Sequence, residues 1–171
     1  GTTGQVLMCG STSGSTMTVE WRDNRGAAEA GRVRLQSAVE VANNSSVAIS
    51  WTSDEFLTNS SLHSTGTNPT RLTPQTTGVF QCAAELAFRS SSPTRGVVWI
   101  EDSSGDQVAA GQERGTTGAY SILTMGLKRF DVTGGWVRVV VSVEGGTNSI
   151  VSDTGGSNNN AANSYFSIVR F

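Results

Sequence analysis

The sequence predicts an all-β protein, and within that class an antiparallel β-sandwich of the jelly-roll type with about eight to ten strands. Three observations support this. Gly, Ser, Thr and Asn are abundant, with 20 glycines among 171 residues, and such residues favour turns and strands over helices. Apolar and polar side chains alternate over runs of strand length. Short turn signals separate these runs.

The first 30 residues predict a flexible or extended lead-in that attaches the domain to something else. They are rich in Gly, Ser and Thr, and their apolar residues form two short islands at 6–8 and 19–21. Such a segment offers too little apolar surface to fold alone. The change of pattern at Gly31 predicts one jelly-roll domain over residues 31–171.

Evenly spaced apolar residues at 33–41 and 47–51 predict two strands around a tight turn at 43–46. A long polar connection is expected over 52–70. The clearest strand follows Gly78, and the side chains expected on its inner face are Phe80, Cys82, Ala84, Leu86 and Phe88.

Five further strands complete the predicted sandwich. Residues 96–101 and 107–110 flank an Asp-Ser-Ser-Gly-Asp turn and predict a hairpin. A strand is expected over 120–130 through Leu123, Met125 and Leu127, although a short helix also fits these residues. Valines alternate with other residues over 136–144. A Gly/Ser/Asn-rich loop at 152–163 leads to a last strand at 165–171.

Charge and motifs exclude several function classes. The 12 basic and 14 acidic side chains give a net charge of −2 without a basic patch, so we expect no nucleic-acid binding. No apolar run approaches the length of a membrane span, so we expect no membrane insertion. The nucleotide and hydrolase fingerprints GxGxxG and GxSxG are absent.

The residues that could support catalysis or bind a metal are few. His63 is the single histidine, and a partly exposed position in a Ser/Thr-rich loop is expected for it rather than a place in a catalytic triad. Cys9 and Cys82 lie far apart and are interpreted as free thiols, which supply no zinc ligand set. We therefore predict no catalytic residue, no metal and no cofactor.

Two acidic pairs, Asp54-Glu55 and Glu101-Asp102, suggest a glycosidase as an alternative. Adjacent residues of a strand point to opposite faces, so neither pair forms such a site by itself. A solvated loop and a hairpin flank are the expected settings. The stretch from Asp102 to Asp106 has a superficial similarity to a calcium loop but lacks the later glutamate.

Residues 71–80, RLTPQTTGVF, resemble a signature of the superfamily that joins tumour necrosis factor to the complement globular head. Pro74 stops one strand, and Gly78 permits the turn that begins the next. The upstream Phe56 and the closing residues 165–169 are also similar to that superfamily, and the resemblance extends over residues 31–171.

A closer resemblance is to bacteriophage virion proteins that carry this jelly roll at their C-terminus. It rests on Trp51-Thr52, His63-Ser64, the run at 68–73, the terminal Phe-Ser-Ile-Val-Arg and the lead-in at 1–7. Trp136 departs from the pattern, because an Asp-Tyr-type pair more often follows the glycine there. The loop at 152–163 is also long.

The resemblance implies a homotrimer with three jelly rolls around an axis, and the sequence offers more large apolar side chains than one thin sandwich needs. The candidate core or trimer contacts are Phe80, Leu86, Phe88, Trp99, Trp136, Tyr165 and Phe171. Stacking of a tryptophan on a sugar ring is the less favoured use of these aromatic residues.

We therefore expect a non-enzymatic virion module on the extracellular particle surface, most simply the trimeric host-adhesion head of a tail protein. The lead-in would contact other virion proteins, and polar loops would contact a host cell-surface glycan. The candidate recognition residues are Asn59, His63, Asn68, Asn158, Asn159 and Asn160. The alternatives are a capsid-decoration or head-fibre protein, a secreted cytokine-like or complement-like ligand, and a cell-wall polysaccharide hydrolase.

Overall fold

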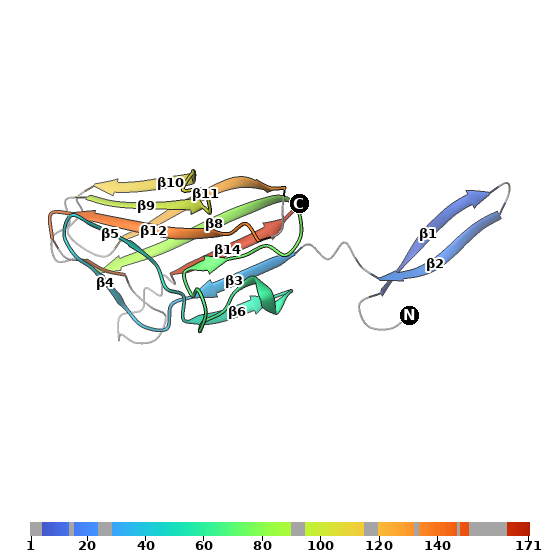
Figure 1. The fold of residues 1–171 in the computed structure, drawn as a ribbon, viewed down its shortest axis with the longest axis horizontal. Helices are drawn as coiled ribbons and strands as arrows, with labels where there is room; N and C mark the ends of the chain where they lie inside the picture. The colour runs from blue at the N-terminus through green and yellow to red at the C-terminus, as the bar shows by residue number, and fades with distance from the viewer. Residues whose placement is uncertain are drawn as a thin grey trace.

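The computed structural model describes residues 5–13, 16–23, 29–89, 95–114, 120–131, 134–146, 148–150 and 164–171. Two antiparallel sheets face each other across an apolar core (Figure 1), which confirms the predicted all-β jelly roll. The helical structure among these residues is the single 3-10 turn η1, Ser60–Leu62.

One sheet has five strands. Their order is β10 (Gln107–Arg114), β9 (Arg95–Asp102), β12 (Val137–Glu144) and β5 (Ser45–Ala48), and β7 (Arg71–Leu72) also pairs with β12. The predicted hairpin is confirmed as β9–β10. Val137, Val139, Val141 and Val143 of β12 are all buried, as their alternation predicted.

The second sheet has seven strands. Their order is β4 (Val39–Val41), β13 (Asn148–Ile150), β8 (Gly78–Arg89), β14 (Tyr165–Arg170), β3 (Ala30–Arg34) and β6 (Ser53–Leu57). The strand β11 (Tyr120–Phe130) pairs along the other side of β8, so the strand reading of 120–130 is confirmed and the helical alternative is wrong.

Large side chains from both sheets fill the core. The ring centroids of Trp51 and Phe166 lie 5.9 Å apart. The Phe80 ring stands edge-on to that of Phe130 at 5.5 Å. Burial of each such side chain contributes about 1.5 to 3 kcal/mol relative to exposure, so these contacts dominate the cohesion of the sandwich.

The turn before β8 is held by a buried carboxylate. Glu29 accepts hydrogen bonds from the backbone N–H groups of Gln75 at 2.7 Å and Thr76 at 3.0 Å. Gly78 then adopts a φ of +145°, a conformation that favours glycine, which confirms its expected role at the start of β8.

Two predictions about the first half of the domain were wrong in detail. The run at 33–41 is two strands, because the backbone leaves the sheet after Arg34 and the N–H of Gln36 donates to Oγ1 of Thr52 at 2.7 Å. The supposed connection at 52–70 contains β6 and η1. β6 is an edge strand with mostly exposed side chains, so it lacks the apolar alternation that marks half-buried strands.

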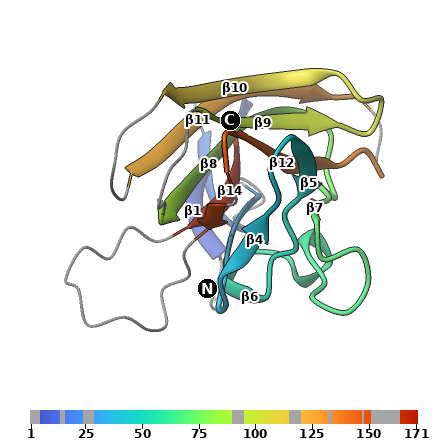
Figure 2. The ribbon, with the colours of Figure 1, turned by 90° about the vertical axis from the view of Figure 1, so that its left-hand side faces the viewer.

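The two sheets come close together where β10 lies beside β11 (Figure 2). Gly126 of β11 allows this approach, since a Cβ atom there would lie 2.5 Å from the backbone oxygen of Val108. The lead-in forms a hairpin of β1 (Gln5–Ser13) and β2 (Thr16–Asp23), which is a separate two-stranded sheet.

Candidate functional site

The polar loop between β6 and β7 forms a pocket of about 230 Å³. Two of the predicted recognition residues, His63 and Asn68, line it, and Asn59 lies just before it at the N-cap of η1. The complete lining is Ser60, Ser61, Leu62, His63, Ser64, Thr67, Asn68, Arg71 and Thr73.

The loop is anchored at both ends by hydrogen bonds and by one apolar side chain. Oδ1 of Asn59 accepts from the N–H of Ser61 at 2.9 Å, which caps η1. The N–H of Thr73 donates to the carbonyl of Leu62 at 2.7 Å. The side chain of Leu62 is fully buried in the core, so the pocket has a fixed floor.

His63 is 5% exposed, so the expectation of a partly exposed loop residue was wrong. Its Nδ1 lies 2.6 Å from Oδ1 of Asp54, and its Nε2 lies 3.1 Å from the carbonyl oxygen of Pro69. Both ring nitrogens are therefore engaged by oxygen atoms that belong to the loop and to β6. The imidazole holds the pocket wall in place and leaves no nitrogen for a catalytic serine.

Asn68 creates the turn that brings Arg71 to the pocket. Its φ is +58°, a left-handed conformation that asparagine tolerates better than most residues. The N–H of Arg71 donates to the carbonyl of Asn68 at 3.1 Å, which closes the turn. The side chain of Asn68 is exposed, as a recognition residue requires.

Arg71 is stacked on Trp136. The guanidinium carbon lies 4.1 Å from the centre of the indole ring, and that of Arg138 lies 5.3 Å from the same ring. Arg138 also donates to Oε1 of Glu101 at 2.6 Å, and Nε1 of Trp99 donates to Oε2 of the same carboxylate at 2.9 Å. Trp99 and Trp136 are thus half-buried members of a polar network on the five-stranded sheet.

The carboxylates of both acidic pairs have basic partners of their own. Asp54 is bound to His63, and Glu55 lies 3.2 Å from Nε of Arg32. Glu101 is bound by Arg138 within the network on the five-stranded sheet. The two members of each pair are thus directed to different partners, which gives neither pair the convergence that glycoside hydrolysis needs.

Asp102 holds the β9–β10 turn. Its Oδ1 accepts from the N–H groups of Ser104 at 2.8 Å and Asp106 at 3.0 Å, and Lys128 donates to its Oδ2. Burial raises the pKa of this carboxyl, but the hydrogen bonds outweigh it and hold the pKa below its ordinary value. Asp102 therefore serves as a turn anchor, and the described residues contain no group of three potential metal ligands.

The candidate core or trimer contacts divide between the inside and the outside of the sandwich. Phe80, Leu86 and Phe88 are fully buried and belong to the core. Tyr165 is half-buried on the opposite side of its sheet, with the guanidinium carbon of Arg32 3.9 Å from its ring centre. Phe171 is 76% exposed.

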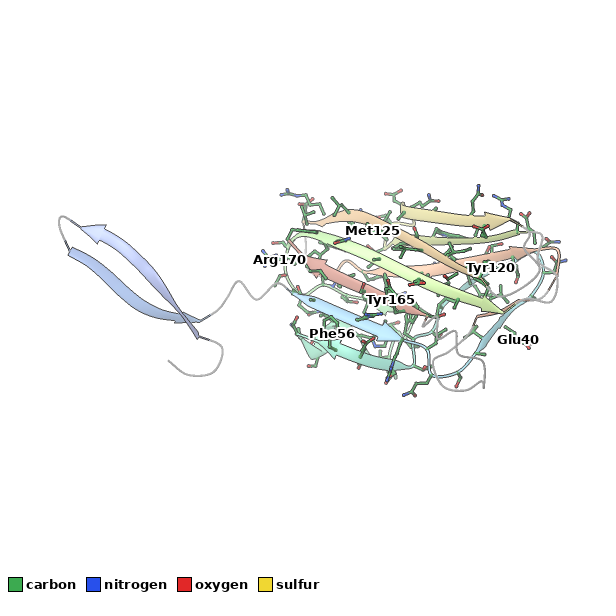
Figure 3. The ribbon with its side chains drawn as sticks, turned by 180° about the vertical axis from the view of Figure 1, so that it is seen from behind. Glu40, Phe56, Tyr120, Met125, Tyr165 and Arg170 are labelled. Atoms are coloured by element: carbon green, nitrogen blue, oxygen red, sulfur yellow. The ribbon has the colours of Figure 1, made fainter. Side chains whose placement is uncertain are left out.

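The outer face of the seven-stranded sheet carries exposed apolar residues, among them Met125 of β11 and Phe56 of β6 (Figure 3). Leu123, Met125 and Leu127 of β11 are 59%, 58% and 65% exposed. Val169 and Phe171 at the end of the chain are also exposed, as is Phe56 of β6. The sequence pattern identified the strand at 120–130 but did not show that Leu123, Met125 and Leu127 face outward.

The remaining predicted recognition residues, Asn158, Asn159 and Asn160, lie outside the described residues, as does the side chain of Cys9. Cys82 is a free, buried thiol, as expected. In the part of the chain that the structure describes, no helix has both the length and the apolar character needed to cross a membrane.

The sequence matches no protein-family profile and no curated protein, whereas solved structures show a common fold. A crystal structure of murine APRIL at pH 8.0 superposes with a TM-score of 0.62 at 8% identity, covering 84% of this chain and 99% of that one. A second, at pH 5.0, gives 0.61 at 7% identity with the same coverage. The globular domain of zebrafish complement 1qA gives 0.54 at 7% identity, covering 81% and 94%. The chain therefore has the jelly-roll fold of the tumour-necrosis-factor and complement globular-head type.

Proposed function

We propose that this chain is a non-enzymatic binding module that works as a homotrimer, and that it is the host-adhesion head of a bacteriophage tail protein on the extracellular surface of the virion. The observation that carries the trimer is the exposed apolar face of the seven-stranded sheet. Three large side chains in line on β11 cost free energy in water unless another chain covers them.

The adhesion role is supported by the separation of apolar and polar side chains within the molecule. The apolar side chains serve the core and the exposed face, whereas the pocket at 60–73 is lined mainly by hydroxyl and amide groups. Such groups suit the hydroxyls of a host cell-surface glycan, and three copies multiply weak contacts. The β1–β2 hairpin, which pairs with neither sheet of the sandwich, is available to contact other virion proteins.

Sedimentation of the purified chain tests the trimer. We expect a particle of three 17.9 kDa chains, and a single negative charge on the exposed face in Leu123→Asp should shift it to monomers. Ala110→Glu adds a charge at an exposed position of β10 in the other sheet and should leave the trimer intact. A monomeric native chain at micromolar concentration would remove the basis for multivalent adhesion.

Incubation with purified bacterial envelopes tests the adhesion role. Stable capture of the chain without release of reducing ends is the expected result. Release of reducing ends would instead favour the hydrolase alternative. Capture by phage capsids but not by envelopes would favour a capsid-decoration protein.

A further inference from the structure

The positively charged guanidinium of Arg71, in the pocket between β6 and β7, plays no part in the proposed trimer contact. Four other arginines have a carboxylate within 3.2 Å or less: Arg32, Arg95, Arg129 and Arg138. Arg71 has no such partner among the described residues, and no carboxylate lines the pocket. Its positive charge is therefore not neutralised locally.

The surroundings of Arg71 orient its guanidinium but leave its buried Nε donor without an acceptor among the described residues. Stacking on Trp136 at 4.1 Å engages the flat face of the group, whereas its N–H donors lie in the plane of the group. The Nε atom is buried and has no hydrogen-bond partner in the part of the chain that the structure describes. A buried donor without an acceptor is unfavourable, so a ligand that accepts hydrogen bonds from the guanidinium would be stabilised here.

Apart from Arg71, Leu62 and His63, the lining residues have uncharged polar side chains. No hydrogen bond within the described structure occupies the hydroxyl groups of Ser60, Ser61, Thr67 and Thr73, and the amide of Asn68 is exposed. The volume of about 230 Å³ lies below the roughly 300 Å³ at which sites for drug-sized ligands begin, so the pocket fits one small unit rather than an oligomer.

We infer that this pocket binds one anionic sugar unit, with its acidic group on the guanidinium of Arg71 and its hydroxyls on the Ser, Thr and Asn side chains. An arginine fork fits the two oxygens of a carboxylate or a phosphate equally well, so the shared requirement is one acidic group on a polyol ring. The inference rests on the proposed function, because it names the class of glycan that the adhesion head would select.

Titration of the full chain with three sugars, followed in ¹H–¹⁵N spectra, tests the inference. Methyl glucuronide and methyl glucoside differ only at C6, which is a carboxylate in the first and a hydroxymethyl group in the second. Glucose 6-phosphate supplies the phosphate. We expect shifts at amides of residues 60–73 with at least one anionic sugar, and about tenfold weaker binding of the glucoside. Equal binding of all three, or no shift at about 50 mM, would overturn the inference.

Two variants in the pocket and a control outside it assign the binding to the pocket. Arg71→Gln should weaken the anionic sugar about tenfold, down to the level of the glucoside. Thr73→Val, which removes a hydroxyl at nearly constant volume, should weaken all the sugars a few-fold. Arg95→Gln removes the same charge from an arginine of the five-stranded sheet outside the pocket lining and should change nothing. Equal effects of Arg71→Gln and Arg95→Gln would contradict the assignment.

These outcomes are separable from those of the proposed function. Envelope capture that survives Arg71→Gln would leave the adhesion head in place and reject the pocket as its site. Binding of the anionic sugar that depends on Arg71, by a chain that fails to capture any envelope, would do the reverse.

Discussion

Lys128 on β11 reaches across the sandwich and donates a hydrogen bond to the carboxylate of Asp102 at the end of β9. This contact joins the seven-stranded sheet to the five-stranded sheet through a buried charge. The side chain of Asp102 is almost completely buried, whereas that of Lys128 is about one-third exposed. The pair therefore adds a charged link between two layers whose shared core is apolar.

Stability should fall in acid because of Asp102. Its pKa in the folded chain lies below the ordinary 3.8, since hydrogen bonds from Lys128 and the turn outweigh the effect of burial. The unfolded chain therefore binds the proton first as pH falls, and the stabilisation, complete above pH 3.8, is lost as pH drops through the folded pKa. Asp102→Asn should lose about 2 kcal/mol at neutral pH and flatten this acid slope, as measured by urea unfolding. An unchanged slope in the variant would assign the acid sensitivity to other carboxylates.

Gly126 should tolerate no side chain. An added Cβ would lie 2.5 Å from the backbone oxygen of Val108, so β10 and β11 would have to separate. We expect Gly126→Ala to cost about 1 to 3 kcal/mol in thermal or urea unfolding. The control is Gly66→Ala, where nothing lies within 4 Å of the added atom, and its stability should stay near that of the native chain. Equal stabilities of the two variants would show that the sheets can part without cost.

Cys82 should be unreactive until the chain unfolds. Burial raises the pKa of its thiol to about 12, so almost no thiolate exists at pH 8. In a Cys9→Ser background, Cys82 is the only thiol of the chain. Its reaction with a disulfide reagent should then follow the unfolding rate and become immediate in denaturant. Fast reaction of the native chain would mean that β8 opens locally.

The sequence predicted the fold where strands are half-buried and long, as in β8 and β12. It did not predict β6 and β7, because an exposed edge strand and a two-residue strand carry no apolar alternation. On β11 the alternation was visible but its two sides were ambiguous. The inward side carries Ile122 and Phe130 but also Thr124, Gly126 and Lys128, so it is no more apolar than the outward side with Leu123, Met125 and Leu127.

The pocket was only partly predictable for a different reason. Asn59, His63 and Asn68 are close in sequence, and a polar loop was a reasonable place for recognition. Arg71 and Trp136 are far apart in the chain, and the pairing of β7 with β12 brings them together. A single sequence contains no signal for that pairing, so only the structure shows that Arg71 lines the pocket and stacks on Trp136.

The pocket wall should depend on His63. The imidazole joins Asp54 of β6 to the carbonyl of Pro69, and both ring nitrogens are used. His63→Ala removes both hydrogen bonds and leaves a cavity, so we expect a loss of about 1 to 3 kcal/mol and faster hydrogen exchange at the amides of residues 68–73. Thr65→Ala changes an exposed side chain of the same loop without an internal hydrogen bond, and it should leave both quantities unchanged. Because the apolar core does not include the imidazole, the amides of β8 and β12 should exchange faster only as far as the global stability falls. A variant that is as stable as Thr65→Ala, with protected loop amides, would show that the hydrogen bonds of Leu62 and Thr73 hold the wall without the histidine.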